Sequence, residues 1–317
     1  MLARITELVI PPAWKDVWIC PYPMGHIQAT GVDAAGRKQY LYHPTWREQR
    51  DRQKFDDMVA FARDLPALRR NAHDIITGSD ALSRDRVLAA AIRLLDRGFF
   101  RIGSEDYAVT NETYGLATMR KELLTIAKDG SMRFDYPAKS GIRQIRELPD
   151  PLTVEVARAL KRRRGGGDEL LAYKERGRWR DVRSADINAF IKEQTDADHS
   201  AKDFRTWNAT LLGARALSRA GRVAETKTGR KKAVAWAVKE VSHYLGNTPA
   251  VCRASYIDPR VIDAYQGGII IEPAMEQAEE EMEPGGPPVI HHPAVERAVL
   301  DLVTGHEAAP GLEQIPA

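Results

Sequence analysis

The sequence predicts an α+β protein, with a small β-rich amino-terminal domain followed by a mostly helical domain that contains a small antiparallel sheet. Three observations predict this class. Short β-prone runs separated by turn residues come first, apolar residues at helical spacing dominate after residue 82, and a hairpin pattern interrupts them near Pro137. A chain of 317 residues is long enough for two hydrophobic cores. We therefore expect domains at residues 1–76 and 77–270, followed by an acidic, largely flexible tail at 271–317.

Composition argues against a membrane or secreted protein. The hydrophobic content of 43% and the charged content of 29% are ordinary for a globular chain. No apolar run reaches the length of about 18 residues that a membrane-spanning helix needs, and the first residues lack the pattern of a signal peptide. Cys20 and Cys252 form no CxxC pair, which predicts free thiols, no structural zinc and a cytoplasmic location.

The net charge of +3 hides a strong asymmetry. From residue 271 onward there are ten acidic residues and one basic residue, Arg297, so residues 1–270 hold 46 Lys and Arg against 34 Asp and Glu. A basic body of this kind favours a polyanionic partner such as nucleic acid, although a merely solvated basic surface would have the same composition.

The amino-terminal module reads as three strands and a helix. The runs 17–20, 26–31 and 38–43 are β-prone, residues 33–36 have turn chemistry, and residues 45–64 have helical spacing. Alternation puts Tyr40 and Tyr42 on one face of the third strand, with Arg37 and Lys38 beside them. This face could stack on DNA sugars or bases and neutralise phosphate, or the two rings could pack as a cross-strand pair.

The second domain opens with a helix whose apolar face runs from Val87 to Leu95 and which ends at Gly98. Arg101 follows in an irregular link between apolar residues, so it must reach a cleft, a partner or a salt bridge. Three β-prone stretches come next, at 114–119, 132–136 and 142–148. The turn between the last two holds out Lys139, either as a surface charge or as an ammonium delivered to a DNA groove.

The remainder of this domain reads as helices. They are expected at 153–162, 184–194, 200–217 and 233–245, with an exposed basic loop at 219–232 and a last ordered helix that ends near 265. Arg205 lies close to aromatic residues at the start of one helix. Gly246 should stop another, and Pro249 should start a short helix that carries Tyr256. Tyr256 is then either a half-buried corner residue or a nucleophile.

Five residues stand in the order Arg, Lys, Arg, His or Asn, Tyr. With the sequence around them they resemble the catalytic site of type IB DNA topoisomerases, in particular the short bacterial and poxvirus-like members. The resemblance covers most of residues 5–265, includes the two-domain arrangement, and rests on six motifs in order. The matching residues are Arg101, Lys139, Arg205, Asn247 and Tyr256, within GRKQYLYHP (36–44), FFRIGSEDY (99–107), YGLATMR (114–120), PAKSGIRQ (137–144), KDFRTW (202–207) and GNTPAVCRASY (246–256).

The resemblance implies an ATP-independent isomerase, a bacterial monomer that works on duplex DNA in the nucleoid. It would nick one strand through a 3′-phosphotyrosyl intermediate, relax supercoils by strand rotation and reseal the strand. Tyr256 would be the nucleophile, and Arg101 and Arg205 would stabilise the transition state. Asn247 would donate to the phosphate, and Lys139 would protonate the departing 5′-oxygen.

The amino-terminal domain would clamp the DNA. The residues predicted to bind DNA outside the catalytic set are Arg37, Lys38, Tyr40, Tyr42, Tyr107 and Lys202. Two departures from the family pattern stand out. Asn247 replaces a histidine that many relatives carry, which keeps a hydrogen-bond donor but removes a proton-transfer group. Ser104 and Asp106 stand where some viral relatives have lysines, so DNA affinity or sequence preference could differ.

The sequence contains no His, Cys and carboxylate cluster with metal-ligand spacing and no GxxxxGK[ST] loop, so we predict neither a metal nor a nucleotide cofactor. Two alternatives share parts of the pattern. Tyrosine recombinases usually carry a histidine three residues before the second arginine, where this chain has Lys202. A non-catalytic DNA-binding protein would bind DNA in a salt-sensitive manner but form no covalent adduct.

Overall fold

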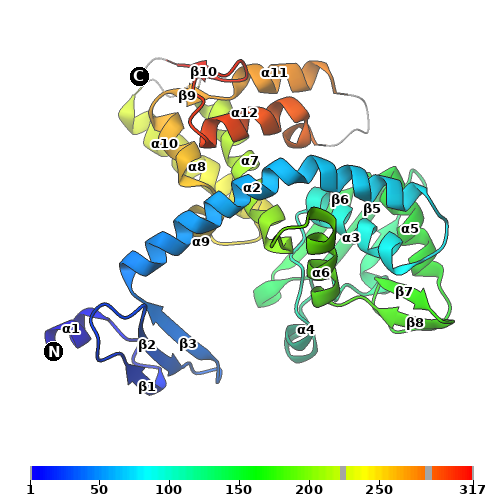
Figure 1. Cartoon of the computed structure of the whole chain (residues 1–317), viewed down its shortest axis with the longest axis horizontal. Coiled ribbons are helices and arrows are strands. Elements are labelled where there is room, and N and C mark those ends of the chain that lie inside the picture. Colours follow the sequence, from blue (N-terminus) through cyan, green and yellow to red (C-terminus); the bar gives the residue numbers. More distant parts are fainter. Residues whose placement is uncertain (1, 222–225, 283–287, 316–317) are drawn as a thin grey trace. The chain divides into compact units, whose positions relative to one another are not determined.

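The computed structural model describes residues 2–221, 226–282 and 288–315. These residues form two compact units, one up to residue 56 and one from residue 57 onward. Helices predominate, and the strands form small antiparallel sheets, so the predicted α+β class is confirmed (Figure 1).

The first unit is built on a three-stranded sheet. After the short helix α1 (Leu2–Glu7), strands β1 (Lys15–Ile19), β2 (Ile27–Val32) and β3 (Lys38–Tyr42) pair in that order, all antiparallel. The turn between β2 and β3 is fixed by Asp33, whose Oδ1 accepts hydrogen bonds from the backbone N–H groups of Ala35 and Arg37. The three predicted strands are therefore present.

Helix α2 (Pro44–Thr77) is longer than the sequence predicted and contains Pro66. Its second half belongs to the second unit, where Phe61, Leu65 and Leu68 are almost fully buried. The boundary expected after residue 76 coincides with the end of this helix, whereas the two compact units divide inside it, at residue 56.

Helix α3 (Arg84–Gly98) lies at the centre of the second unit. It is capped by Ser83 and is buried along most of its length, because alanines, valine, leucines and isoleucine occupy nearly every turn. The surrounding helices are α5 (Pro151–Arg162), α6 (Ser184–Thr195) and α7 (Ala201–Gly221). All four were expected from the helical spacing.

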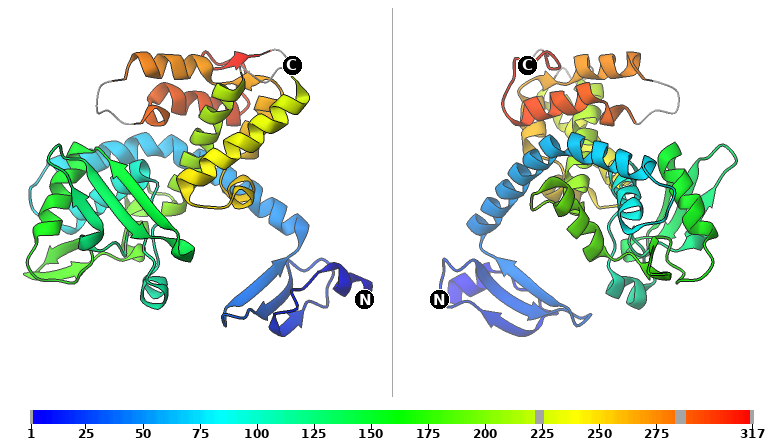
Figure 2. Two further views of the ribbon diagram at one scale, coloured as in Figure 1. Left: turned by 180° about the vertical axis from the view of Figure 1, so that it is seen from behind. Right: turned by 45° about the vertical axis from the view of Figure 1, so that its right-hand side comes forward.

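A second three-stranded sheet carries the predicted hairpin. Strands β4 (Leu124–Ile126), β5 (Met132–Pro137) and β6 (Arg143–Leu148) pair in order, and the single-turn helix η2 (Lys139–Gly141) forms the tip between β5 and β6 (Figure 2). Cα pairing of Tyr136 with Gln144 and of Phe134 with Arg146 puts these four side chains on the inner face. A further hairpin, β7 (Ala172–Glu175) and β8 (Arg178–Asp181), was not predicted.

The strand predicted at residues 114–119 is wrong. This stretch follows α4 (Glu105–Asn111), precedes the short helix η1 (Lys121–Leu123), and forms an irregular loop. Its backbone bonds to another loop, because Leu116 N donates to Arg101 O (2.8 Å) and Ala117 N donates to Ile102 O (2.7 Å). Gly115 permits this approach, since a Cβ there would lie 2.4 Å from Gly103 Cα.

Residues 271–317 were expected to form a largely flexible tail. That expectation is wrong for the described residues of this segment. Helices α11 (Glu272–Glu280) and α12 (Pro293–Val303) pack against each other and against α7, with Met275 and Val299 buried. Two-residue strands β9 (Ile269–Ile270) and β10 (Glu313–Gln314) pair beside them, and η3 (Val289–His291) precedes α12. Glu276, Glu279 and Glu280 lie on the exposed face of α11, whose inner face is apolar, whereas Glu296 of α12 points inward to Arg69.

The expectation of a basic loop at 219–232 is wrong for the described residues of this stretch. Helix α7 continues to Gly221 and α8 (Lys227–Leu245) begins at residue 227, so all three lysines lie on a helix, and residues 222–225 lie outside the described part. Two short helices follow, α9 (Pro249–Ser255) and α10 (Pro259–Gln266).

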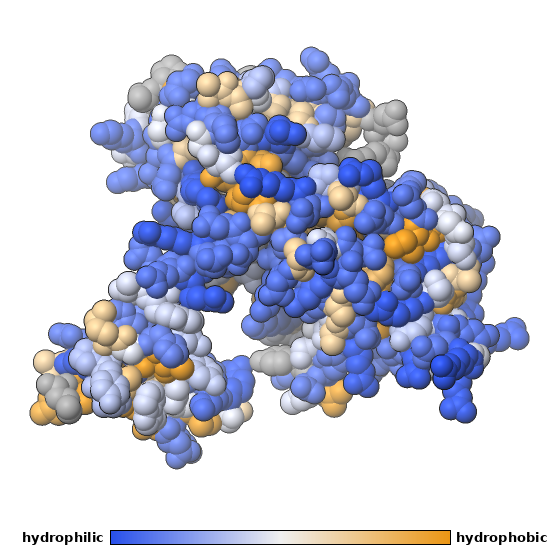
Figure 3. All heavy atoms as spheres, in the orientation of Figure 1, coloured by the Kyte–Doolittle hydropathy of each residue, from blue (hydrophilic) through white to orange (hydrophobic). Residues whose placement is uncertain are grey.

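Hydrophilic residues dominate the face of the molecule in Figure 3, where apolar side chains form only small, separate groups. Among the described residues, no helix combines the length and the apolar character that crossing a membrane requires.

Candidate active site

Arg205 is fixed near the start of α7 by two backbone carbonyls. Its Nη1 donates to Phe99 O and its Nη2 donates to Leu245 O, both at 2.9 Å, and the side chain is buried. Phe99 accepts this bond from a left-handed conformation (φ 55°) at the end of α3. Helix α7 therefore brings a guanidinium to the point where α3 and α8 end.

Arg101 reaches the same point from the link after α3, which the loop at 114–118 supports. Its Nη2 donates to the side-chain oxygen of Asn247 and, at 3.3 Å, to the carbonyl of Gly246. Gly246 ends α8 with φ 61°, and a Cβ there would lie 2.8 Å from Gln144 Nε2. The positive φ favours glycine at this position, whereas the side chain of Gln144 on β6 could move away from a Cβ.

Tyr256 ends α9, which begins at Pro249 with Thr248 as its N-cap. Its phenol ring lies under the guanidinium of Arg205, whose central carbon is 5.4 Å from the ring centroid. Helix α7 also holds the backbone around Tyr256, because Thr210 Oγ1 donates to Tyr256 O (3.4 Å) and accepts from Asp258 N (3.2 Å). One helix therefore positions both the arginine and the tyrosine.

The electrostatics of this cluster make the phenol of Tyr256 easier to ionise than a free tyrosine. Burial raises the pKa of Tyr256, but the charges of Arg205 and Arg101 outweigh burial and bring the pKa below its ordinary value. Burial, together with the charge of Arg101, lowers the pKa of Arg205 to about 10. By contrast, burial raises the pKa of the nearby Cys252 thiol to about 11, so this cysteine stays protonated at neutral pH.

Lys139 lies where the sequence predicted it, exposed at the tip of the β5–β6 hairpin. It lines a surface hollow together with Arg101, Gly103 and Tyr114. The structure therefore brings Arg101, Asn247, Tyr256 and Arg205 into one cluster, in which each contacts the next, and places Lys139 at the rim of a hollow that Arg101 shares.

Sequence reasoning missed Arg146 on β6. Its guanidinium lines a pocket with Arg101, Arg205, Tyr114 and Tyr136. The alternation of side chains along β6 puts Arg146 on the inner face of the sheet, and this alternation can be seen in the sequence. Nothing in the sequence showed that the inner face borders the site.

Residues 43–282 match the family model described as the catalytic core of eukaryotic DNA topoisomerase I, and residues 1–33 match that of the N-terminal domain of bacterial DNA topoisomerase IB. The chain belongs to the type IB DNA topoisomerase family. It is thereby assigned to the isomerases of the topoisomerase I type.

Two curated relatives support this assignment. DNA topoisomerase 1B of Acanthamoeba polyphaga mimivirus is 30% identical over 272 residues, which cover 84% of this chain and 80% of the relative. DNA topoisomerase 1 of Daucus carota is 28% identical over 130 residues, which cover 41% of this chain and 15% of that much longer protein.

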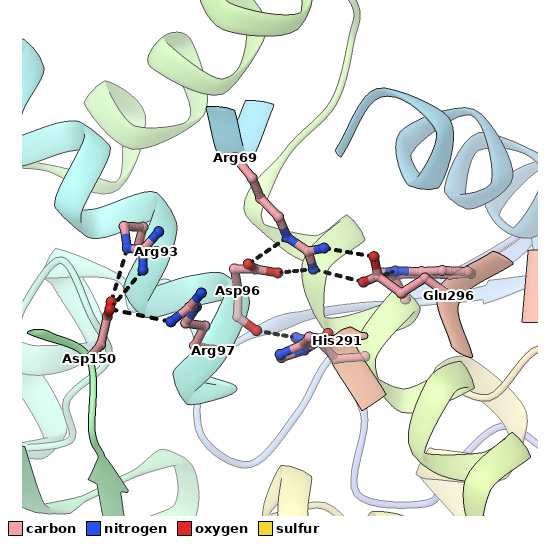
Figure 4. A network of polar contacts seen from close by, with 9 residues as sticks. Arg69, Arg93, Asp96, Arg97, Asp150, His291 and Glu296 are labelled. Atoms are coloured by element: carbon pink, nitrogen blue, oxygen red, sulfur yellow. Dashed lines mark hydrogen bonds and ion pairs between the residues drawn. The ribbon is translucent and has the colours of Figure 1, made fainter. Parts of the chain in front are cut away.

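A largely buried polar network joins elements around the candidate site (Figure 4). Arg69 of α2 lies between Asp96 of α3 (2.8 Å) and Glu296 of α12 (2.7 Å). His291 bonds to Asn208 of α7 (3.0 Å) and stacks on Phe99, with ring centroids 6.0 Å apart. The carboxyl-terminal helices are therefore tied to the two elements that present Arg101 and Arg205.

Asp150, at the start of α5, anchors a second part of this network. Arg93 donates to both of its carboxylate oxygens, at 2.7 and 3.0 Å, and Arg97 approaches to 3.3 Å. Burial raises the pKa of Asp150, but the hydrogen bonds and charge of Arg93 outweigh burial and lower it overall.

In the first unit, the face of β3 predicted to bind DNA is exposed. Tyr40 and Tyr42 stack on each other (6.0 Å), Tyr42 stacks on Trp46 (4.7 Å), and the ammonium of Lys38 lies 5.7 Å from the Tyr40 ring centroid. The two tyrosines thus form an outer-face row and not a core pair. Trp46, which extends the row, was missed. Arg37 forms an ion pair with Asp33 (2.7 Å), which lowers the pKa of that carboxyl to about 2.

Two other predicted DNA-binding residues lie in the second unit. Lys202 is exposed in the first turn of α7, and the side chain of Tyr107 lies outside the described part of the structure. Within the described residues, no group of three or more His, Cys, Asp and Glu side chains is placed to hold a metal ion.

Proposed function

We propose that this topoisomerase nicks one strand of duplex DNA with Tyr256, allows the strand to rotate, and reseals it. The single observation that carries the proposal is the contact of the Tyr256 ring with the guanidinium of Arg205, which has two carbonyl partners and no carboxylate partner among the described residues. An arginine held in this way keeps an unneutralised charge beside the phenol, where a phosphate would supply the missing anion.

Arg101 and Arg205 lower the main energetic cost of using a tyrosine as nucleophile, which is the ionisation of its phenol. A free phenol with a pKa near 10 is ionised to only about 0.1% at pH 7, so the phenolate costs roughly 4 kcal/mol. Arg205 and Arg101 reduce this cost by lowering the pKa of Tyr256. The same guanidiniums can then bind the non-bridging oxygens, whose negative charge grows in the transition state.

The proposed step exchanges one phosphodiester for another. The phenol of Tyr256 first loses its proton to solvent. Its Oη then forms a bond to the phosphorus while the bond from phosphorus to the 5′-oxygen breaks, and Lys139 gives a proton to that oxygen. Asn247 donates from its amide to a phosphate oxygen. Because the 3′-phosphotyrosyl bond retains the energy of the original bond, the free 5′-hydroxyl can attack it and reseal the strand without ATP or metal.

Trapping the intermediate tests this function. Duplex DNA labelled at either end of the cut strand is mixed with the protein, and the reaction is stopped with detergent. We expect a covalent adduct that retains the 5′-labelled fragment, because the tyrosine holds the 3′-phosphate, and no adduct with Tyr256→Phe. Salt-sensitive binding without any adduct would instead identify a non-catalytic DNA-binding protein.

A cytoplasmic, monomeric protein remains our prediction.

A further inference from the structure

Two sets of buried or half-buried arginines in the second unit differ in their partners. Arg69 and Arg93 face carboxylates, namely Asp96, Glu296 and Asp150. Arg101, Arg146 and Arg205, which line one pocket, form no ion pair with any described residue. Arg101 and Arg205 belong to the predicted catalytic set, whereas Arg146 has no role in the proposed reaction.

The partners of Arg146 are neutral. Its Nη2 donates to Gln144 Oε1 (2.8 Å) and to the carbonyl of Tyr244, and the phenol of Tyr136 is its other neighbour. Its Nε is buried without a hydrogen-bond partner among the described residues. A buried guanidinium with an unused N–H group is costly unless an anion completes its surroundings.

Neighbouring positive charges add to the cost of burying Arg146. Burial lowers the pKa of Arg146, and the charge of Arg101 lowers it further. Arg146 in turn contributes to the lowered pKa of Arg205. Three positive groups that repel one another in a poorly solvated pocket store unfavourable energy, which a bound polyanion would relieve.

The position of Arg146 indicates which anion it meets. Besides the pocket, Arg146 lines an open groove between β6 and α8, which begins at Gly246 and Asn247 and is bordered by Trp236 and Lys239. If Arg101 and Arg205 hold one phosphate of a DNA strand, a neighbouring phosphate of that strand can lie at the mouth of this groove. Adjacent phosphates along a DNA strand are only a few Å apart.

We propose that Arg146 binds a backbone phosphate of the cut strand, next to the phosphate held by Arg101 and Arg205. This inference rests on the proposed function and adds a DNA-binding residue to it. Gln144 and Tyr244 then serve to hold the guanidinium in place before DNA arrives.

The test measures DNA affinity by fluorescence anisotropy with cleavage switched off by Tyr256→Phe. Binding is followed between about 50 and 200 mM salt, since each phosphate contact contributes about −0.9 to the slope of log K against log salt. In this background, Arg146→Gln should make the slope shallower by about 0.9 and weaken binding at low salt roughly tenfold. Arg146→Lys, which keeps a point charge, should retain most of the slope.

The matched control is Arg133→Gln, on the outer face of the same hairpin, where Arg133 pairs with Glu147 at 2.8 Å. Its slope should equal that of the parent. Thermal unfolding separates binding from structure: Arg146→Gln should melt at or above the parent temperature, because it removes an unneutralised buried charge.

An unchanged slope for Arg146→Gln, with the parent still binding DNA, would overturn the inference and leave the proposed function standing. A lower melting temperature with an unchanged slope would assign Arg146 a structural role instead. A parent that shows no salt-dependent DNA binding would refute the proposed function, and the inference with it.

Discussion

At the scale of single residues, Arg205 has two tasks that can be separated. Its guanidinium joins the ends of α3 and α8 through two carbonyls, and its charge lowers the pKa of Tyr256. In the proposed mechanism the second task makes the reaction depend on pH, because cleavage would use the phenolate and the phenolate fraction rises as the pH approaches the pKa.

Arg205→Gln should therefore raise the pKa of Tyr256 and move the rising limb of the cleavage profile to higher pH. Ultraviolet absorbance of tyrosinate, taken as the difference from the same protein with Tyr256→Phe, measures the pKa directly. Arg219→Gln, at an exposed position on the same helix, is the control. A phenol pKa that stays constant when Arg205 is replaced would contradict the electrostatic role.

Lys139→Ala should slow cleavage of an ordinary strand by about 10²- to 10⁴-fold, the usual contribution of a general acid. A strand with a better leaving group at the 5′ position needs no proton, so its cleavage should be nearly unaffected. Single-turnover cleavage rates of both strands check this, with the exposed Lys128→Ala as control. An equal loss on both strands would show that Lys139 only binds DNA.

The sequence predicted which residues lie together at the candidate site. Arg101, Arg205, Asn247 and Tyr256 do meet, as their order in the chain predicted. Arg146 was missed because an arginine on an alternating strand is usually solvated, and only the register of β5 with β6 shows that it faces the site.

At the scale of elements, the carboxyl-terminal helices α11 and α12 are packed into the second compact unit. Glu296 of α12 accepts bonds from Arg69 (2.7 and 2.8 Å) and from Trp207 of α7 (3.4 Å). Glutamine at this position keeps one acceptor oxygen but replaces the other by an NH2 group, which leaves one N–H of Arg69 without its acceptor in a mostly buried site.

Glu296→Gln should therefore lower the free energy of unfolding by about 1–3 kcal/mol, as expected when a buried charged hydrogen bond is lost. Urea denaturation measures this change, and Glu307→Gln, at an exposed position of the same segment, should have almost no effect. If the two variants were equally stable, the segment would be the loosely attached tail that its composition suggested.

Sequence pattern predicted the helices of the second unit well and its irregular parts poorly. Periodic apolar residues fix a helix locally, as in α3 and α8. The stretch 114–119 has β-prone residues, but its backbone bonds to the link at Arg101 and to Pro137, so tertiary contacts override propensity. In α11, acidic residues concealed an apolar face that includes Ala274, Met275 and Ala278.

At the scale of the whole molecule, the two compact units divide the predicted tasks. All five predicted catalytic residues lie after residue 56, whereas the stacked row of Tyr40, Tyr42 and Trp46 lies before it. The two units should therefore be separable in experiment.

A fragment of residues 57–317 should unfold cooperatively and still form the Tyr256 adduct, but bind duplex DNA at least about tenfold more weakly and with a shallower salt dependence. Anisotropy titrations against the full chain measure the loss, and circular dichroism verifies that the fragment is folded. Undiminished affinity of the fragment would remove the first unit from the DNA interface.

The central claim is that Tyr256 performs the covalent chemistry without metal or ATP. Relaxation of supercoiled plasmid in EDTA, without ATP, tests it most directly when the wild type is compared with Tyr256→Phe. We predict that the wild type relaxes the plasmid and that the variant binds it but leaves it supercoiled. Equal relaxation by both proteins would contradict the assignment of Tyr256 as the nucleophile.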